Sequence, residues 1–189
     1  MTAIAAFTDG RTAALAYDSG TEHQENLMLA NLAKRPRVHD IVSPKGKPRG
    51  RLVLASCGLH RVTNEIVNRW TPPTRTRSTA TVAYMLDVGA SLQEHMAAAG
   101  DVVMDGRFLD GEFVAICDGR VFGIGECFSV FEPTSGLLTA GSGGYVALGA
   151  MAALDEHLAP ADVVRRAVEI ACEHVPGIIG PIHVETTTA

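Results

Sequence analysis

The chain has 189 residues, of which 47% are hydrophobic, 20% are charged and 5% are aromatic. This length and composition favour one folded domain over residues 1–189 and exclude a disordered or collagen-like chain. The formal net charge of −5 argues against a general nucleic-acid-binding protein, which would need many Lys and Arg contacts to phosphates.

An apolar run, an Asp-Gly-Arg turn and a second apolar run occur twice in the chain. The first set comprises residues 2–17, with its turn at 9–11, and the second comprises residues 112–125, with its turn at 118–120. Asp-Gly accepts the positive φ angles of tight turns whose twist matches paired strands. Both segments are therefore predicted to be β-hairpins, and their strands are predicted to be buried on both faces.

The rest of the chain supplies further strands and two pairs of helices. A polar loop is predicted at 19–33, and Pro36 predicts that the adjoining strand lies at a sheet edge or contains a bulge. Further strands are predicted at 51–57, 128–131, 136–140 and 181–187, and helices at 59–70, 79–99, 145–157 and from about 160 to 175. Paired helices argue against a doubly wound parallel sheet. We expect an α+β fold, a four-layer α/β/β/α sandwich of two antiparallel sheets with a helix pair on each outer face.

Several features limit the setting and the chemistry of the protein. The densest apolar stretch, residues 145–154, is too short to span a membrane, and the N-terminus does not resemble a secretory signal. We therefore expect a cytoplasmic protein with no membrane partner. The four cysteines form no Cys-x-x-Cys pair and are predicted to be buried and reduced. No metal is expected from the histidine spacing, and no cofactor is expected because phosphate-binding motifs are missing.

Seven of the sixteen basic residues lie between Lys34 and Arg51. Such a concentration is typical of a solvated or ring-lining surface, or alternatively of a site for an anion or a partner. Its start at Lys34 predicts that it neighbours the catalytic group described next.

The amino terminus can itself supply a catalytic group. Removal of Met1 would leave Thr2 with both a hydroxyl nucleophile and a free α-amine. The pKa of such an amine is about 7.7–8, so it can act as a general base near neutral pH. Asp18 ends the second strand of the first hairpin, which returns beside residue 2, and Lys34 follows the next loop. The two charges are expected to converge at the open end of the hairpin.

With Thr2, Asp18 and Lys34 in this register, the sequence resembles the β-type subunits of proteasomes and the bacterial heat-shock-locus peptidase HslV. These proteins are N-terminal nucleophile hydrolases, and the resemblance covers nearly the whole chain. It implies that Thr2 is the nucleophile and that Asp18 orients Lys34. The positive charge of Lys34 is then expected to lower the pKa of the Thr2 amine.

Three further positions match or depart from the family pattern. Gly58 falls at the strand-to-helix junction whose N–H group donates to the oxyanion, and Ser142 lies in a Gly-Ser-Gly-Gly segment whose serine hydrogen-bonds near the nucleophile. Glu173 takes the place of a supporting aspartate, whereas Pro176 replaces the serine that follows it in the family. The cation-binding segment of HslV is not recognisable in this region, so the resemblance implies no metal.

The resemblance implies a threonine endopeptidase subunit of a self-compartmentalising, homo-oligomeric ring. Its substrate would be a peptide or an unfolded protein, delivered where required by an ATPase unfoldase. Two alternatives remain open. A hydrolase of the same nucleophile class would act on small amides. A non-catalytic proteasome-like scaffold or assembly protein would retain Met1, which acylates the Thr2 nitrogen and abolishes its basicity.

Overall fold

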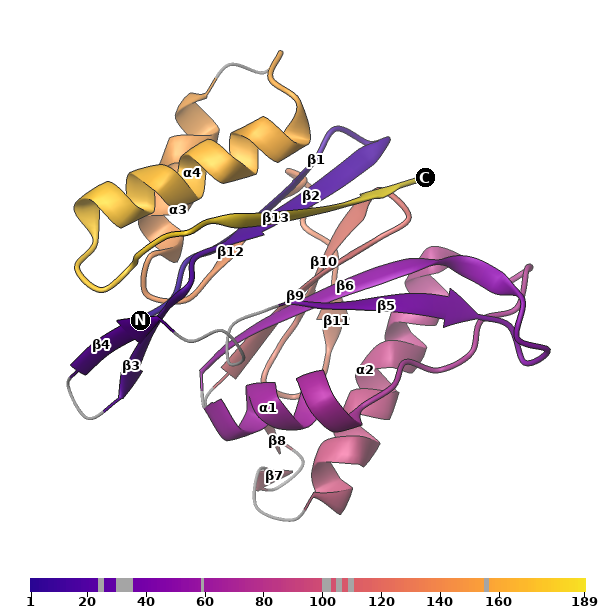
Figure 1. Ribbon diagram of the computed structural model, residues 1–189. Helices are drawn as coiled ribbons and strands as arrows, with labels where there is room; N and C mark the ends of the chain where they lie inside the picture. The colour runs from indigo at the N-terminus through magenta and orange to yellow at the C-terminus, as the bar shows by residue number, and fades with distance from the viewer. Residues whose placement is uncertain are drawn as a thin grey trace.

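The computed structural model describes residues 1–23, 26–29, 36–58, 60–99, 103–104, 107–108, 111–154 and 157–189. Two antiparallel sheets lie face to face, and a pair of helices covers the outer face of each (Figure 1). The α+β, four-layer α/β/β/α sandwich predicted from the sequence is therefore confirmed.

The first sheet contains the N-terminal hairpin and the C-terminal strand. Its order is β12 (Leu137–Ala140), β1 (Ile4–Thr8), β2 (Thr12–Tyr17) and β13 (His183–Thr188). Helices α3 (Gly144–Ala153) and α4 (Pro160–His174) pack on its outer face. Small side chains dominate this contact, because seven of its twelve fully or nearly fully buried residues are alanines.

The second sheet contains the second Asp-Gly-Arg hairpin. Its order is β11 (Val130–Phe131), β10 (Arg120–Ile124), β9 (Gly111–Cys117), β6 (Pro48–Gly58) and β5 (Arg37–Val42). Helices α1 (His60–Arg69) and α2 (Thr81–Ala98) cover its outer face. Large side chains fill this layer, among them Trp70, Tyr84, Phe113 and Phe122.

The tips of the two predicted hairpins meet at one end of the sandwich. The Thr8 hydroxyl donates to the Gly119 carbonyl at 2.5 Å, and the Gly119 N–H donates to Thr187 Oγ1 at 3.2 Å. The C-terminal Ala189 N–H donates to the Arg11 carbonyl at 2.9 Å. Gly10 and Gly119 have φ angles of 89° and 69°, as the turn chemistry requires. The two bonds of Gly119 link the two sheets, and the inner side chains of both form a third core between them.

Parts of the predicted pattern are wrong. The segment at 19–33 is not simply a polar loop, because it contains β3 (Gly20–His23) and β4 (Asn26–Leu29), which pair with each other. A second small pair, β7 (Val103–Met104) and β8 (Arg107–Phe108), also has no strand signal in the sequence. Strand β5 was not assigned a range either, although its edge position agrees with the prediction from Pro36.

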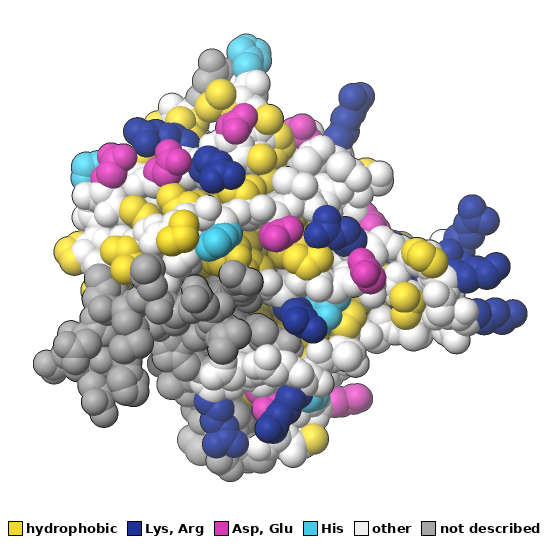
Figure 2. Space-filling view, viewed as in Figure 1, with side chains coloured by type: hydrophobic (Ala, Val, Ile, Leu, Met, Phe, Trp, Pro, Cys, Tyr) yellow, Lys and Arg dark blue, Asp and Glu magenta, His cyan; other side chains and the backbone are white. Residues whose placement is uncertain are grey.

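The basic segment extends away from the N-terminus onto an exposed surface, as one of its predicted interpretations has it, and the cysteines are less buried than predicted. Lys45 and Lys47 lie in the turn between β5 and β6, at the opposite end of the molecule from the N-terminus (Figure 1). Lys and Arg side chains gather at this projecting end in the space-filling view (Figure 2). Of the four cysteines only Cys117 is buried, whereas Cys127 is exposed. No helix within the described ranges is long and apolar enough to cross a membrane.

Candidate active site

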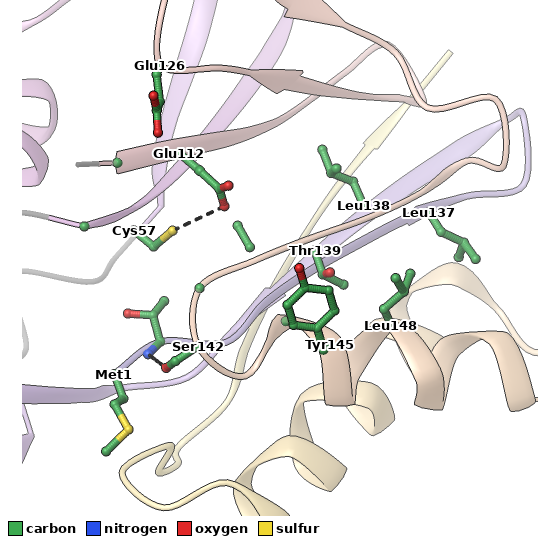
Figure 3. A pocket seen from close by; sticks show the side chains of 16 residues that line it. Met1, Cys57, Glu112, Glu126, Leu137, Leu138, Thr139, Ser142, Tyr145 and Leu148 are labelled. Atoms are coloured by element: carbon green, nitrogen blue, oxygen red, sulfur yellow. Dashed lines mark hydrogen bonds between the residues drawn. The ribbon is translucent and has the colours of Figure 1, made fainter. Parts of the chain in front are cut away.

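A pocket of about 730 Å³ opens beside the N-terminus, between the ends of the two sheets (Figure 3). The first sheet contributes the N-terminal residues, β12 and the start of α3. The second contributes the end of β6, the start of β9 and the segment after β10. The lining residues are Met1, Thr2, Cys57, Gly58, Gly111, Glu112, Glu126, Leu137, Leu138, Thr139, Ala140, Gly141, Ser142, Gly144, Tyr145 and Leu148.

Thr2 is held by the loop that joins β12 to α3. Its backbone N–H donates to Ser142 Oγ at 3.1 Å, and its carbonyl accepts from the Gly143 N–H at 2.9 Å. Gly141 has a φ of 82°, and a Cβ at this position would lie 2.9 Å from both the carbonyl carbon and the Cβ of Thr2. The loop can therefore reach Thr2 only because Gly141 has no side chain.

Asp18 contacts Ala3, the residue that follows Thr2. Its side chain is fully buried, and its two carboxylate oxygens accept from the Ala3 N–H at 2.9 Å and the Gly20 N–H at 3.0 Å. Hydrogen bonds from backbone N–H groups stabilise a buried carboxylate. The structure thus brings Asp18 beside the N-terminal strand, as predicted. Lys34 lies outside the described residues, so its predicted contact with Asp18 stays a prediction.

Gly58 reaches the pocket from the second sheet. It is the last residue of β6, has a φ of 115° and pairs with Gly111 at the start of β9. Neighbouring residues in the same register are Cys57 and Glu112, and the Cys57 Sγ contacts Glu112 Oε2 at 4.0 Å (Figure 3). Thr2, Ser142 and Gly58 therefore line one pocket although they are up to 140 positions apart.

Comparisons with known proteins bear on the fold. No family model and no curated protein sequence matches the chain. Among solved structures, "Thiobacillus denitrificans BPH" has a TM-score of 0.74 at 21% identity, over 100% of this chain and 98% of that one. HslV from Trypanosoma brucei has a TM-score of 0.64 at 16% identity, over 99% of each chain. A Gly-1 mutant of Anbu from Hyphomicrobium sp. strain MC1 has a TM-score of 0.73 at 16% identity, over 100% of this chain and 85% of that one.

The chain has the proteasome β-type fold. Because all these sequence identities are low, the similarity concerns the fold and not the chemistry of the site. In this chain Thr2 lies just before the first sheet, and the pocket beside it is also lined by residues of the second sheet.

Glu173, the remaining predicted site residue, is not at the pocket of the proteasome-like fold. Its side chain is 55% exposed on α4 and accepts from Arg166 Nη1 at 3.3 Å. The nearby Gly177 is the residue that approaches the N-terminus, since a Cβ there would lie 3.2 Å from Met1 Sδ. Sequence reasoning also missed Glu112 and Glu126, for which no local motif exists. Only the pairing of β6, β9 and β10 brings them to the pocket.

Proposed function

We propose that the protein, after loss of Met1, is a threonine peptidase that uses Thr2 as its N-terminal nucleophile. The observation that supports it most directly is the contact between the Thr2 nitrogen and Ser142 Oγ at 3.1 Å, inside the pocket. In the intact chain this nitrogen is an amide that donates a proton. Once it is the α-amine, the same hydroxyl can orient it beside the Thr2 side chain.

The reaction then proceeds through an acyl-enzyme. The Thr2 amine takes the proton of the Thr2 hydroxyl as its oxygen attacks the peptide carbonyl, and this proton passes to the leaving amine when the C–N bond breaks. The Gly58 N–H donates to the oxyanion, an interaction that contributes roughly 3–4 kcal/mol in acyl transfer. Asp18 orients Lys34, whose positive charge lowers the pKa of the amine. Water, deprotonated by the amine, finally hydrolyses the ester.

The proposal includes assembly into a homo-oligomeric ring in the cytoplasm that cleaves peptides or unfolded proteins, with an ATPase unfoldase as partner. Two neighbours support assembly: HslV from Trypanosoma brucei and an Anbu complex from Pseudomonas aeruginosa whose structure is described as a helical assembly. Two large apolar side chains, Val82 and Leu86, are exposed on α2, which suits packing between subunits.

Intact-mass measurement of the purified protein tests the proposal. We expect Met1 to be absent, and we expect epoxomicin to add one equivalent of mass; this compound is bound in a structure of the Thiobacillus denitrificans protein. Thr2→Ala should abolish both the adduct and peptide hydrolysis, whereas Thr134→Ala, at an exposed position outside the pocket, should change neither. Full retention of Met1 in protein that hydrolyses peptides would contradict the Thr2 assignment.

A second function is favoured by the contact between Met1 and Gly177. Gly177 has no side chain, and this leaves room for the Met1 side chain. If Met1 is retained, the Thr2 nitrogen has no basicity, and the chain is a non-catalytic scaffold or assembly subunit. Retained Met1, no epoxomicin adduct and an intact oligomer in native mass spectrometry would together identify this case. Hydrolysis of small acyl-amides but of no peptide would instead identify an amidohydrolase.

A further inference from the structure

Among the described residues that line the pocket beside Thr2, the charged side chains lie on one wall. Glu112 and Glu126 are the sole charged side chains among the described residues that line it. Glu112 lies at the start of β9 and Glu126 lies two residues beyond the end of β10, the adjacent antiparallel strand. Both carboxylates therefore come from the same end of the second sheet, and Figure 3 shows them on the same side of the pocket.

The side of the pocket away from the glutamates carries three large apolar side chains, Leu137, Tyr145 and Leu148, together with the polar Thr139 (Figure 3). Tyr145 is 89% exposed, so its ring is free to cover a ligand at the pocket mouth. Apolar side chains opposite two exposed carboxylates suit a substrate side chain with a long hydrocarbon stem and a positively charged end, because Lys and Arg bury their stems and keep their charged ends in polar surroundings.

The Cys57 thiol lies beside Glu112. The two residues are cross-strand partners on β6 and β9, and Cys57 Sγ lies 4.0 Å from Glu112 Oε2. The thiol is a weak donor, so the carboxylate keeps most of its capacity to accept hydrogen bonds from a guanidinium or ammonium group. A volume of about 730 Å³ is more than one such side chain needs.

We propose that this pocket selects substrates with a cationic side chain, Arg or Lys, close to the bond that Thr2 cleaves, and that Glu112 and Glu126 determine this selectivity. The inference rests on the proposed peptidase function, because it places the substrate by its reacting carbonyl at Thr2. It adds the chemical class of the side chain, which the fold does not specify.

Hydrolysis of matched peptides tests the selectivity. One series of fluorogenic peptides has Arg at each position of the peptide in turn. A second series has citrulline at the same positions, because citrulline has nearly the same shape as Arg without the charge. At the preferred position we expect kcat/KM to be about tenfold higher for Arg than for citrulline, a ratio that rises at low salt. Equal values at every position would overturn the inference.

Variants then assign the effect to the two glutamates. Glu112→Gln and Glu126→Gln should each reduce the Arg-to-citrulline ratio about threefold, and the double variant should abolish it, with citrulline hydrolysis retained. Glu94→Gln removes the same charge at an exposed position of α2 outside the pocket and should leave the ratio unchanged. A double variant that folds, by circular dichroism, and still prefers Arg would assign selectivity elsewhere and contradict the inference.

Binding separates this inference from the proposed function. Fluorescence anisotropy with Thr2→Ala protein measures affinity for the Arg and citrulline peptides without any reaction. Tighter binding of the Arg peptide, lost in the double glutamine variant, supports the charged pocket even if wild-type protein hydrolyses nothing. Conversely, hydrolysis that depends on Thr2 but shows no charge preference in binding or rate supports the peptidase and overturns the selectivity.

Discussion

The two halves of the sandwich are built from side chains of different size. Between the first sheet and α3 and α4 the core is largely alanine, with Ala5, Ala16 and Ala171 fully buried. Between the second sheet and α1 and α2 it contains Trp70 and Phe122. Small side chains let backbones approach closely, whereas large ones fill volume and fix distances between layers.

This difference accounts for how each half contributes to the pocket. The first half positions the backbone of Thr2 through Ser142 Oγ and the Gly143 N–H, and buried Asp18 holds the N–H of the next residue, Ala3. The second half contributes the side chains of Glu112, on β9, and of Glu126, just beyond β10, next to the large core. We therefore expect substitutions around Thr2 in the first half to change catalysis through its position, and substitutions in the large core of the second half to change stability. Gly58, Glu112 and Glu126 are second-half residues that line the pocket directly and are outside this division.

The largest effect is expected for Gly141→Ala. An added Cβ would lie 2.9 Å from Thr2 Cβ and closer still to its carbonyl oxygen, so Thr2 must move. A displacement of about 1 Å can lower a rate about 100-fold, and we expect a loss of peptide hydrolysis of this order. Gly46→Ala is the matched control, because its φ is 71° and a Cβ there meets nothing within 4 Å. Equal loss in both variants would show that general strain, rather than displacement of Thr2, is responsible.

In the second half, Arg75→Ala should cause the largest loss of stability. The Arg75 side chain is 10% exposed, and its Nη1 donates to Asp118 Oδ2 at 2.5 Å. Its removal takes away the charged donor of the Asp118 carboxylate and leaves the weaker Thr81 hydroxyl, so we expect a loss of about 3 kcal/mol in the free energy of unfolding. Urea denaturation measures it. Arg51→Ala, which breaks an exposed pair with Glu185, should cost under about 1 kcal/mol; equal losses would contradict this account.

The sequence predicts the hairpins and helices well because their signals are local. Asp-Gly turns mark both hairpins, and helix α4 shows its core face in the spacing of Val164, Ala167 and Ala171. The same spacing places Glu173 on the opposite, exposed face, so helical periodicity alone argues against a role for it at the pocket. The predicted site includes Glu173 because of its position in the family motif, although the helical periodicity indicates an exposed residue.

The pocket wall could not be predicted because its residues share no local pattern. Glu112 and Cys57 meet through the pairing of β6 with β9, which is fixed by contacts along the full length of both strands. The small β3–β4 pair was missed for a related reason, since Gly20–His23 contains no alternation of apolar and polar residues. Thr2 and Ser142, in contrast, were found because each belongs to a recognisable family segment.

A smaller effect should come from His39 on β5. Its ring packs edge-on against Trp70, its Nε2 has no hydrogen-bond partner among the described residues, and burial lowers its pKa from 6.5 to about 4, with a smaller contribution from Arg37. Between these values the unfolded chain binds a proton that the folded chain does not. Stability is therefore complete above about pH 6.5 and falls as the pH drops towards 4, by an expected amount on the order of 2 kcal/mol.

Urea denaturation at pH 7 and pH 4.5 measures this difference. His39→Leu should remove this part of the pH dependence, because leucine does not titrate. His174→Leu, at an exposed position in the last turn of α4, should retain it. If the His39→Leu protein lost as much stability on acidification as the wild type, the buried imidazole would not be its source.

The smallest effect is expected for Glu173→Gln. This variant tests whether the family motif or the exposed position on α4 predicts the role of Glu173 correctly. Glu173 is 55% exposed and shares Arg166 with Glu169, so its loss should change stability by less than about 0.5 kcal/mol. Peptide hydrolysis should stay within about twofold of wild type, since Glu173 lies outside the pocket. Ser142→Ala, which removes the acceptor of the Thr2 nitrogen, should instead lower hydrolysis at least tenfold. A larger loss from Glu173→Gln than from Ser142→Ala would mean that α4 supports the N-terminus through a route other than the contacts around Thr2.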